Sequence, residues 1–399
     1  MIGSVAIVGA SLAGIRTAEA LRASGFDGQV ILFGDEPHLP YDRPPLSKGY
    51  LAGKDDRARI ELRKQVLYQS EAIDTVLSTR VLGLAVAPSS VTLELAGQHL
   101  DFDAVVIATG SRTRPAPFPV DHPSVHEIRT VDDADRLRPL LVDGVRVVVV
   151  GAGFIGAEVA STAKNLGCSV TVVEAAPVPL SRQLGDEMGS AVAALHERNG
   201  VTLLAGVVVR AIRANGVELI DETLLEADVV VIGIGVIPNT EWLDSSGLEI
   251  RDGVCTDEQL RARTTSGASV DHVVAVGDVV RWTNQLFDEE MRIEHWTNAT
   301  ESAVHAASTL MGGRDAYAPI PYFWSDQYGR KIQFLGRSTG FDEVQVVQGS
   351  TTDDSWLALY RRGDRLVGAL GVHKMRALMP FRKAILERAS WQDALTLIG

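Results

Sequence analysis

The chain has 399 residues, of which 46% are hydrophobic and 22% charged, a composition typical of a globular protein with two or three domains. Its formal net charge of −13 argues against a general nucleic-acid binder, which would show a basic footprint. The sequence contains only two cysteines, Cys168 and Cys255, which excludes a disulfide framework and a cysteine-rich metal site. No basic or apolar leader pattern precedes the first predicted strand, so we expect no targeting segment, and no uninterrupted apolar run reaches membrane-spanning length. We expect a cytoplasmic protein with no metal, membrane or nucleic-acid partner.

A strand, a tight turn and a helix are predicted at the start of the chain. Residues 5–8 are apolar, and Gly-Ala-Ser-Leu-Ala-Gly at 9–14 leads into a helical pattern over 12–21. In a dinucleotide-binding loop the first glycine makes the turn, the middle one admits a pyrophosphate, and the last lets helix pack on strand. The phosphates then lie at the helix N-terminus. Ser11 occupies the middle position, so an ordinary glycine-rich turn is the alternative.

Acidic residues follow the second predicted strand, residues 30–33. A carboxylate at this position can accept hydrogen bonds from ribose hydroxyls. We therefore predict a first nucleotide site. Its candidate residues are Gly9, Ser11, Leu12, Ala13, Gly14, Asp35 and Glu36.

Residues 37–48 contain four prolines, which exclude a regular helix interior or a central strand. We predict a stiff loop that presents Arg43 and Lys48, the alternative being a surface loop with solvated charges. Residues 104–110 are predicted as a buried strand that ends in Ala-Thr-Gly, and the proline-rich stretch 112–119 as a domain crossover. We add the residues of that strand end, Ala108, Thr109 and Gly110, to the cofactor-binding set.

A second, complete dinucleotide signature lies in the middle of the chain. The valine-rich strand at 145–150 is followed by Gly-Ala-Gly-Phe-Ile-Gly, a helix over 157–166, and a strand at 170–173 that Glu174 closes. Glu174 would bind an adenosine ribose and repel a 2′-phosphate, which favours NADH over NADPH. The candidate residues here are Gly151, Gly153, Phe154, Ile155, Gly156 and Glu174.

The chain then returns toward the first nucleotide fold. Residues 228–239, which include Gly235, are predicted as one buried strand ending in a second crossover. A strand over 273–280 ends in Gly277-Asp278, and this acid suits a ligand polyol, with a turn aspartate as the alternative. A helix over 299–310 is predicted to be capped by Thr297 or Asn298. Its N-terminus would stabilise the anionic reduced ring of a flavin.

The last part of the chain is predicted to be a small α+β domain. It begins with the aromatic stretch Pro-Tyr-Phe-Trp-Ser-Asp-Gln-Tyr at 321–328, continues with four strands, and closes with helices over 374–388 and 391–397. An aromatic run of this kind is more often core than active site.

These motifs together resemble the bacterial NADH-dependent ferredoxin reductase family. This putidaredoxin reductase-like family includes the reductase components of cytochrome P450 and ring-hydroxylating dioxygenase systems. The resemblance runs from residue 4 to about residue 375, and its most specific marks are Tyr-Asp-Arg-Pro-Pro-Leu-Ser-Lys at 41–48 and Phe-Trp-Ser-Asp-Gln-Tyr at 323–328. It implies a glutathione-reductase-like α/β fold with two Rossmann-type domains and a small α+β domain. The implied segments are 1–112 and 241–318 for FAD, 113–240 for NADH, and 319–399 for the C-terminal domain.

The resemblance also implies roles for single residues. Lys48 would lie beside the isoalloxazine, Glu158 near the nicotinamide, and Trp324 between flavin and partner, so Lys48 and Glu158 are the catalytic candidates. Basic residues that face the partner differ among members, and only Arg63 and Lys331 can be suggested. The residues implied to touch FAD are Ala13, Asp35, Lys48, Val81, Arg129, Asp278 and Trp296, with Arg43, Gly235 and Gly277 also in the cofactor-binding set.

The implied reaction moves a hydride from NADH to FAD and then single electrons to an iron–sulfur ferredoxin, which serves a P450 or a ring-hydroxylating oxygenase. A disulfide reductase would need two nearby cysteines, and residues 43–48 contain none. A flavin-containing NADH oxidase or peroxidase with a single redox cysteine is disfavoured because neither cysteine is placed for that chemistry. A redox protein resembling apoptosis-inducing factor is disfavoured by the absence of a targeting sequence and of long basic segments. Both remain as alternatives.

Overall fold

The computed structural model describes residues 2–398, and the chain forms two compact units. Unit 1 consists of Met1–Asp42, Glu61–Arg112 and Ile237–Pro321. Unit 2 consists of Arg43–Ile60, Thr113–Val236 and Tyr322–Gly399. The chain passes between them within the paired strands β8 (Ser111–Thr113) and β17 (Val236–Pro238), among other places.

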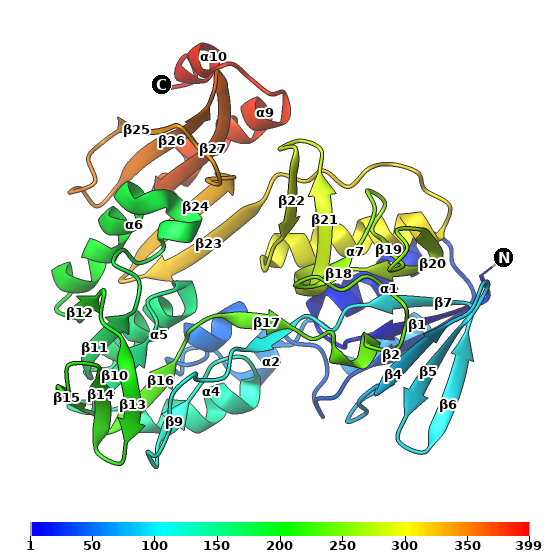
Figure 1. Ribbon diagram of the computed structural model, residues 1–399, viewed down its shortest axis with the longest axis horizontal. Helices are drawn as coiled ribbons and strands as arrows, with labels where there is room; N and C mark the ends of the chain where they lie inside the picture. Colours follow the sequence, from blue (N-terminus) through cyan, green and yellow to red (C-terminus); the bar gives the residue numbers. More distant parts are fainter. Residues whose placement is uncertain (1, 399) are drawn as a thin grey trace. The chain divides into compact units, whose positions relative to one another are not determined.

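Unit 1 is built around a six-stranded sheet with the order β19-β20-β7-β1-β2-β3, parallel except at the β19 edge. β7 is buried along its whole length, as expected for a central parallel strand covered on both faces. Helices α1 and α7 lie side by side in this unit (Figure 1). The elements are β1 (Ser4–Val8), α1 (Leu12–Ala23), β2 (Gln29–Phe33), α3 (Gln65–Ser70), β3 (Ile73–Val76), β4 (Gly83–Val86), β5 (Val91–Leu95), β6 (Gln98–Phe102), β7 (Ala104–Ile107), β18 (Val254–Cys255), β19 (Arg261–Arg263), β20 (Ser269–Ala275), β21 (Val280–Asn284), β22 (Glu289–Arg292) and α7 (Trp296–Leu310), with the 3₁₀ turns η3 (Glu241–Leu243) and η4 (Gly277–Val279).

Unit 2 contains a second parallel sheet, with the order β12-β11-β10-β16-β9. Helix α5 packs on β10 and β11, and a three-stranded antiparallel sheet, β13-β14-β15, belongs to the same unit. The elements are η1 (Pro44–Ser47), α2 (Arg57–Ile60), β9 (Val125–His126), α4 (Val131–Leu137), η2 (Arg138–Leu140), β10 (Arg146–Val150), α5 (Phe154–Asn165), β11 (Ser169–Glu174), α6 (Ser181–Arg198), β12 (Thr202–Ala205), β13 (Val209–Arg213), β14 (Gly216–Leu219), β15 (Leu224–Glu226) and β16 (Val229–Ile232).

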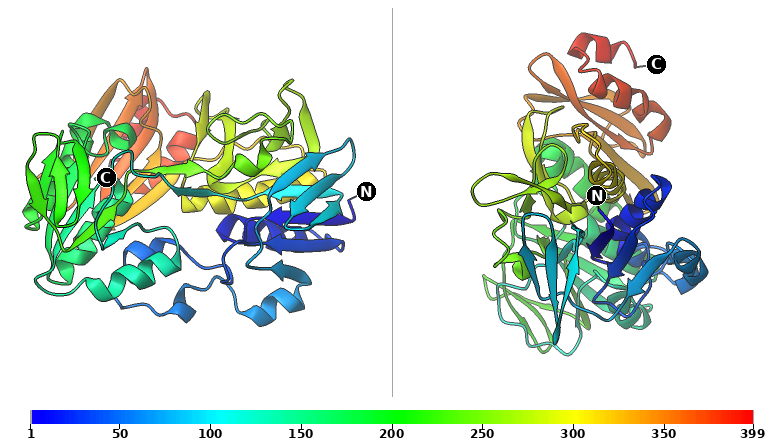
Figure 2. Two further views of the ribbon diagram at one scale, coloured as in Figure 1. Left: turned by 60° about the horizontal axis from the view of Figure 1, so that its bottom comes forward. Right: turned by 90° about the vertical axis from the view of Figure 1, so that its right-hand side faces the viewer.

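The C-terminal part of unit 2 is an antiparallel sheet with the order β23-β24-β27-β26-β25. The C-terminal helices, red in Figure 2, pack on its central strand β27, and β23 packs on α5. The elements are β23 (Tyr322–Gln327), β24 (Arg330–Gly336), β25 (Glu343–Gln348), β26 (Trp356–Arg362), β27 (Arg365–Val372), α8 (Met375–Leu378), α9 (Pro380–Leu386) and α10 (Trp391–Leu395).

Four predictions of local structure were wrong. The strand expected over 273–280 ends at Ala275, because the chain turns at Gly277, with a φ of 73°, into the 3₁₀ turn η4. The expected strand over 228–239 is two strands, β16 and β17, because the chain turns at Gly233-Ile-Gly235, where Gly235 has a φ of 100°. The expected helix over 374–388 is interrupted before Pro380, which has no N–H to continue the α8 ladder. Helix α7 begins at Trp296 with His295 as its N-cap, so neither Thr297 nor Asn298 caps it.

Among residues 2–398, none of the helices is both long and apolar enough to cross a membrane.

Candidate functional site

The glycines of the first loop are required by packing within unit 1. Gly9 has a φ of 121°, and a Cβ there would lie 2.1 Å from the carbonyl oxygen of Ala108. A Cβ on Gly14 would lie 2.0 Å from the carbonyl oxygen of Gly9, so only glycine lets α1 approach the turn this closely. Ser11 is the N-cap residue of α1, but its side chain makes no capping hydrogen bond.

The second loop repeats this geometry in unit 2 and adds an opening. A Cβ on Gly151 would lie 2.3 Å from the carbonyl oxygen of Gly233, and one on Gly156 would lie 2.1 Å from that of Gly151. Gly153 is different, because a Cβ there would meet no heavy atom within 4 Å and its φ of −69° suits any residue. The protein's own packing therefore leaves space at Gly153. Space beside the N-terminus of α5 fits the pyrophosphate of a dinucleotide.

The acidic residue of the second unit is fixed beside this loop. Glu174, at the end of β11, accepts hydrogen bonds from the backbone N–H of Ala152 (2.8 Å) and of Ala176 (2.8 Å). Each carboxylate oxygen has further lone pairs, so the group can also accept hydrogen bonds from ribose hydroxyls.

In unit 1 the corresponding acids are paired with side chains of the chain itself. Asp35 forms an exposed ion pair with Arg80 (2.9 Å), and Glu36 accepts a hydrogen bond from the Tyr41 hydroxyl. Sequence reasoning identified Asp35 and Glu36 but missed Arg80, which directly precedes the predicted cofactor residue Val81.

Helix α7 holds the Gly277-Asp278 turn that follows β20. Ser302 accepts from the Gly277 N–H (3.0 Å), and the Asn298 amide donates to the Gly277 carbonyl (3.1 Å). Asp278 accepts from the Ser111 hydroxyl (2.8 Å). At the start of α7 the indole N–H of Trp296 donates to Asp42 (2.8 Å).

The remaining predicted residues of unit 1 lie at the carboxyl ends of its parallel strands or are buried near them. Thr109 donates to the Asn239 carbonyl (2.7 Å), and the Gly110 carbonyl accepts from the Asn239 N–H (2.9 Å). Asn239 is a residue of this network that the sequence analysis missed. The other predicted residues that are buried in this unit are Leu12, Ala13, Val81 and Ala108.

In unit 2 the two catalytic candidates are in contact. Lys48 follows η1, and its ammonium lies 2.5 Å from the Glu158 carboxylate on α5. Two serines not identified from sequence, Ser47 and Ser325, donate to the same carboxylate at 2.6 and 2.7 Å. Arg43 donates to the Arg129 carbonyl at 2.5 Å, so these predicted residues also lie together.

The other predicted residues of unit 2 lie near the second loop or on β23. Phe154 packs on Phe323, with ring centroids 4.6 Å apart, and Ile155 is 41% exposed. The Gly235 carbonyl accepts from the Arg114 N–H (2.9 Å). Trp324 is half-buried, with its ring centroid 6.1 Å from that of Tyr322.

The two basic residues suggested for partner binding are both close to acids. Arg63 forms ion pairs with Glu19 and Glu71, and only 24% of its side chain is exposed. Lys331 lies 3.5 Å from Asp326. Neither residue presents an uncompensated positive charge to an acidic partner.

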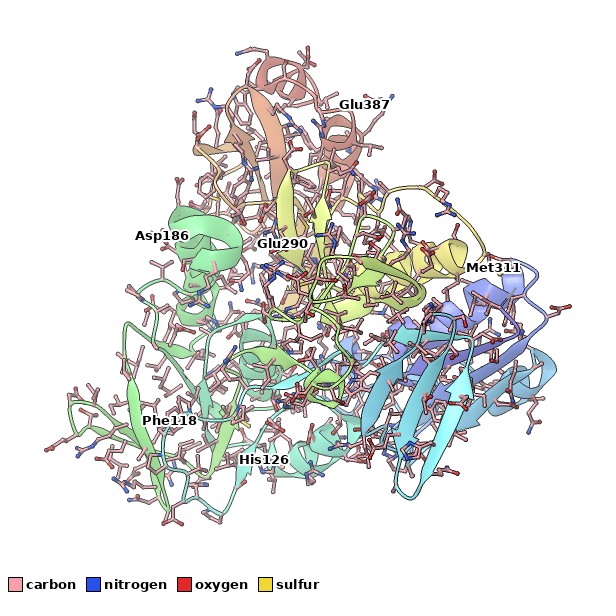
Figure 3. All side chains as sticks on the ribbon, turned by 45° about the vertical axis from the view of Figure 1, so that its right-hand side comes forward. Phe118, His126, Asp186, Glu290, Met311 and Glu387 are labelled. Atoms are coloured by element: carbon pink, nitrogen blue, oxygen red, sulfur yellow. The ribbon has the colours of Figure 1, made fainter. Side chains whose placement is uncertain are left out.

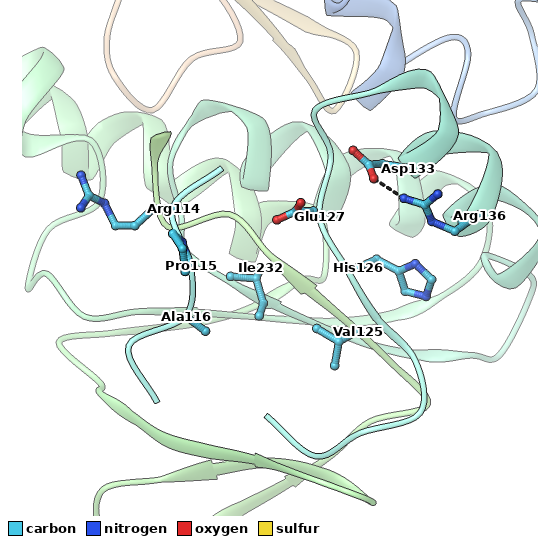
Figure 4. Close-up of a pocket in the computed structure, with 9 residues that line it drawn as sticks. All are labelled: Arg114, Pro115, Ala116, Val125, His126, Glu127, Asp133, Arg136 and Ile232. Carbon is cyan, nitrogen blue, oxygen red and sulfur yellow. Dashed lines mark hydrogen bonds and ion pairs between the residues drawn. The ribbon is translucent and has the colours of Figure 1, made fainter. Parts of the chain in front are cut away.

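A pocket of about 280 Å³ lies at the carboxyl ends of β9 and β16 (Figure 4). None of its lining residues was predicted from the sequence. Within it Arg136 is ion-paired with Asp133, and burial is the main cause that lowers the pKa of His126. The lining residues are Arg114, Pro115, Ala116, Val125, His126, Glu127, Asp133, Arg136 and Ile232.

The cysteines do not form a redox centre. Cys168 and Cys255 are both free and buried, and they belong to different units. Burial raises the pKa of each thiol, so both stay protonated at neutral pH. Thiol–disulfide chemistry needs a thiolate.

Comparison with known proteins places this geometry among redox enzymes. Residues 3–303 match the family described as pyridine nucleotide-disulphide oxidoreductase, and residues 322–396 match the reductase C-terminal family. The chain is 39% identical over 385 residues to the anthranilate 1,2-dioxygenase system ferredoxin--NAD(+) reductase component of Burkholderia cepacia, covering 95% of this chain and 93% of that protein. It is 34% identical to putidaredoxin reductase CamA of Pseudomonas putida, covering 96% and 92%. A solved covalent putidaredoxin reductase–putidaredoxin complex matches with a TM-score of 0.92 at 33% identity, covering 98% of this chain and 95% of that one.

Proposed function

The chain belongs to the pyridine nucleotide-disulphide oxidoreductase family, and we propose that it is an FAD-dependent ferredoxin reductase that oxidises NADH. The observation that carries this proposal is the extent of the similarity, since relatives named as ferredoxin reductases are 34% and 39% identical over at least 95% of the chain. The expected electron acceptor is an iron–sulfur ferredoxin that serves a P450 or ring-hydroxylating oxygenase. Such a reductase works where NADH and its oxygenase are present, and we infer a cytoplasmic location.

The two glycine loops support a division of labour between the cofactors. We assign FAD to the first loop, with Asp278 and Trp296, and NADH to the second loop, with Glu174. When bound, FAD would supply the change from two-electron hydride acceptance to single-electron donation, chemistry that amino-acid side chains lack. The chain's residues would bind and orient both nucleotides, and Lys48 would supply the positive charge expected beside the flavin. The contacts of Arg43, Lys48 and Arg129 with FAD remain predictions.

The proposed domain assignment is residues 1–112 and 241–318 for FAD, 113–240 for NADH, and 319–399 for the C-terminal domain. The boundaries of unit 1 at Arg112, Ile237 and Pro321 lie close to these limits. Residues 43–60 belong to unit 2 by their contacts, although they are assigned to the FAD segment.

The residues around Lys48 argue against the disulfide and cysteine-peroxidase alternatives. The 3₁₀ turn η1 contains no cysteine, and Lys48 forms an ion pair there. The raised pKa of both thiols removes the thiolate that either alternative needs. Two alternatives remain: an NADH oxidase without a redox cysteine and a protein resembling apoptosis-inducing factor. Each differs from the proposed ferredoxin reductase only in its electron acceptor.

Anaerobic stopped-flow spectroscopy tests the proposal. The purified protein is expected to hold one non-covalent FAD per chain and to be bleached by NADH. Oxidised ferredoxin should then restore the flavin absorbance much faster than dissolved oxygen does. Reoxidation by oxygen alone at the faster rate would identify an oxidase, and a colourless protein would contradict the cofactor assignment.

The acceptor requires a surface, and α8 and α9 provide a basic one. Residues 374–388 contain five basic side chains and one acidic side chain, in a chain with a net charge of −13. Arg376 and Lys383 are exposed, as are Met375 and Met379. Glu387, labelled in Figure 3, follows α9 and lies 3.7 Å from Lys383. The positive charge of α8 and α9 and the exposed apolar atoms on these helices suit an acidic ferredoxin.

A further inference from the structure

The Glu158 carboxylate is held by donors from two other segments of unit 2. The side chain is 5% exposed. Its Oε2 atom accepts from Ser47 Oγ and Lys48 Nζ, at 2.6 and 2.5 Å, and both donors lie in the proline-rich segment. Its Oε1 atom accepts from Ser325 Oγ at 2.7 Å, on β23. A buried carboxylate with this many donors is fixed in orientation.

Ser325 can donate to Glu158 because of the residue behind it. Ser325 is completely buried, and the Gln327 amide donates to its oxygen at 3.1 Å. An amide NH₂ group is only a donor, so the single Ser325 proton is directed to Glu158. Ser325 and Gln327 lie on the same face of β23, because residues two apart in a strand point the same way.

The strand itself is fixed to the helix that carries Glu158. The Tyr328 N–H donates to Ser161 Oγ at 2.7 Å, and Ser161 lies on α5 one turn after Glu158. The Tyr328 hydroxyl contacts His196 Nδ1 on α6 at 2.6 Å. The contacts of Tyr328 with α5 and α6 therefore fix the position of Ser325 on β23 relative to Glu158 on α5.

We propose that Ser325, oriented by Gln327, is a positioning residue that holds Lys48 in place through Glu158. This rests on the proposed function, in which Lys48 lies beside the flavin. Oε1 also accepts a longer hydrogen bond from the Asp326 N–H, at 3.4 Å. When the shorter Ser325 bond is lost, this longer bond alone holds Oε1, so the carboxylate can rotate and Oε2 moves from Lys48. The ammonium then relies on its other acceptor, the Pro44 carbonyl at 3.1 Å, and its charge moves. A fixed positive charge near a flavin favours the reduced, more negative form.

The primary test is the midpoint potential of the bound FAD in the holoenzyme, which does not involve ferredoxin. Ser325→Ala should lower the equilibrium constant for flavin reduction about threefold to tenfold, which for a two-electron couple is a shift of about 15–30 mV to more negative potential. Ser325→Thr, which keeps the hydroxyl, should have a midpoint potential close to that of the wild type. Gln327→Met should shift the potential in the same direction by a smaller amount.

Two further variants separate positioning from a general loss of stability. Ser338 is another buried serine of unit 2 whose hydroxyl donates to a carbonyl, that of Gln183, at 2.7 Å. Ser338→Ala should lower the melting temperature of the holoenzyme by an amount similar to Ser325→Ala and leave the flavin potential unchanged. In a Glu158→Gln background, Ser325→Ala should cause no additional shift, because both changes act through one carboxylate.

Three results would overturn the inference. The first is an unchanged flavin potential in Ser325→Ala. The second is an equal shift caused by Ser325→Ala in the wild-type and the Glu158→Gln backgrounds. The third is a shift of the same size in Ser338→Ala. If Ser325→Ala does not fold, Gln327→Met decides by the same criteria. If the proposed function is wrong, the protein would instead contain no FAD, or it would show the expected midpoint potentials of FAD but transfer no electrons to ferredoxin.

Discussion

Glu174 lies at the end of β11 with each carboxylate oxygen bonded to a backbone N–H. Glu174→Ala would remove the proposed ribose acceptor and the charge proposed to repel a 2′-phosphate. The ratio of kcat/KM for NADH to kcat/KM for NADPH should fall about tenfold or more, equivalent to about 1.4 kcal/mol. Steady-state kinetics with both donors measures this ratio.

Glu174→Gln is the matched variant. Its amide oxygen can still accept one backbone hydrogen bond, but the charge is absent. If charge repulsion sets the preference, kcat/KM for NADPH should rise in both variants. The value of kcat/KM for NADH should fall less in Glu174→Gln than in Glu174→Ala. A wild-type enzyme that prefers NADPH would show that Glu174 has another role.

Gly151 and Gly153 belong to one loop, but the structure predicts opposite effects for them. Gly153→Ala places a methyl group in open space at an ordinary φ, so it should cost about 1 kcal/mol or less in stability, the difference between glycine and alanine as an N-cap. The KM for NADH should rise at least several-fold, because the methyl group occupies the space assigned to the pyrophosphate. Thermal unfolding and NADH titration measure the two effects.

Gly151→Ala provides the contrast. Its Cβ would lie 2.3 Å from the Gly233 carbonyl at a φ of 107°, so this variant should be strongly destabilised with or without nucleotide. If Gly153→Ala instead unfolds the protein and leaves NADH binding unchanged, the opening at Gly153 is not the pyrophosphate site.

At the scale of the element, β23 has two faces with different roles. Ser325 points toward Glu158, whereas the neighbouring Trp324 points to the opposite face and pairs with Gln333 on β24. Trp324→Ala should therefore leave flavin reduction by NADH within about twofold of wild type. Ferredoxin-dependent reduction of cytochrome c should slow about tenfold or more, the effect of removing an interface tryptophan. Stopped-flow and steady-state assays separate the two half-reactions.

Trp324→Phe should give an intermediate rate, because the ring is reduced in size but kept. Loss of FAD in Trp324→Ala would show that the residue is part of the core. If both half-reactions are unchanged, the electrons leave through another surface.

Helices α8 and α9 allow a test of the docking surface. Arg376→Glu or Lys383→Glu should raise the KM for an acidic ferredoxin about threefold to tenfold at low salt. The effect should shrink above about 0.5 M salt, where exposed charges are screened. Arg210→Glu, a reversal at a half-exposed arginine on β13, is the control and should have little effect. An equal effect of all three reversals would point to net charge rather than docking at α8 and α9.

The elements around the two loops were predictable because their determinants are local. A glycine that packs against the carbonyl five residues earlier, as Gly14 and Gly156 do, leaves its signature within one short stretch. The Ser325–Glu158 bond joins residues 167 positions apart, and Ser47 is 111 positions from Glu158. Both serines lie within recognisable motifs, but no spacing in the sequence shows that they share a carboxylate. The charge on α8 and α9 was visible in the sequence, but its exposure was not.

At the scale of the whole molecule, the chain uses one strand–loop–helix design twice, once in each unit. In both units the first glycine packs on a strand-end carbonyl and the last packs on the first. The two copies differ at the middle position, which is Ser11 in the first loop and Gly153 in the second.

Stability of the molecule should depend on pH through its buried histidines. His196 is 2% exposed, and burial lowers its pKa to about 4, below its usual value near 6.5. The unfolded chain therefore binds a proton between pH 6.5 and 4 that the folded chain excludes. Stability from this group is complete above pH 6.5 and is lost as the pH falls. Burial also lowers the pKa of His126 and His305, which adds to the same trend.

His196→Gln keeps a side-chain acceptor for the Tyr328 hydroxyl but cannot titrate. The wild-type free energy of unfolding should fall by about 1.4 kcal/mol more than that of the variant between pH 7.5 and 5.5. Urea unfolding of the holoenzyme at both pH values measures this difference, and the other titrating groups cancel between the two proteins. His99→Gln, at an exposed histidine on β6, should behave like wild type. Equal pH dependence in His196→Gln and wild type would mean that His196 is protonated in the folded protein, contrary to its burial.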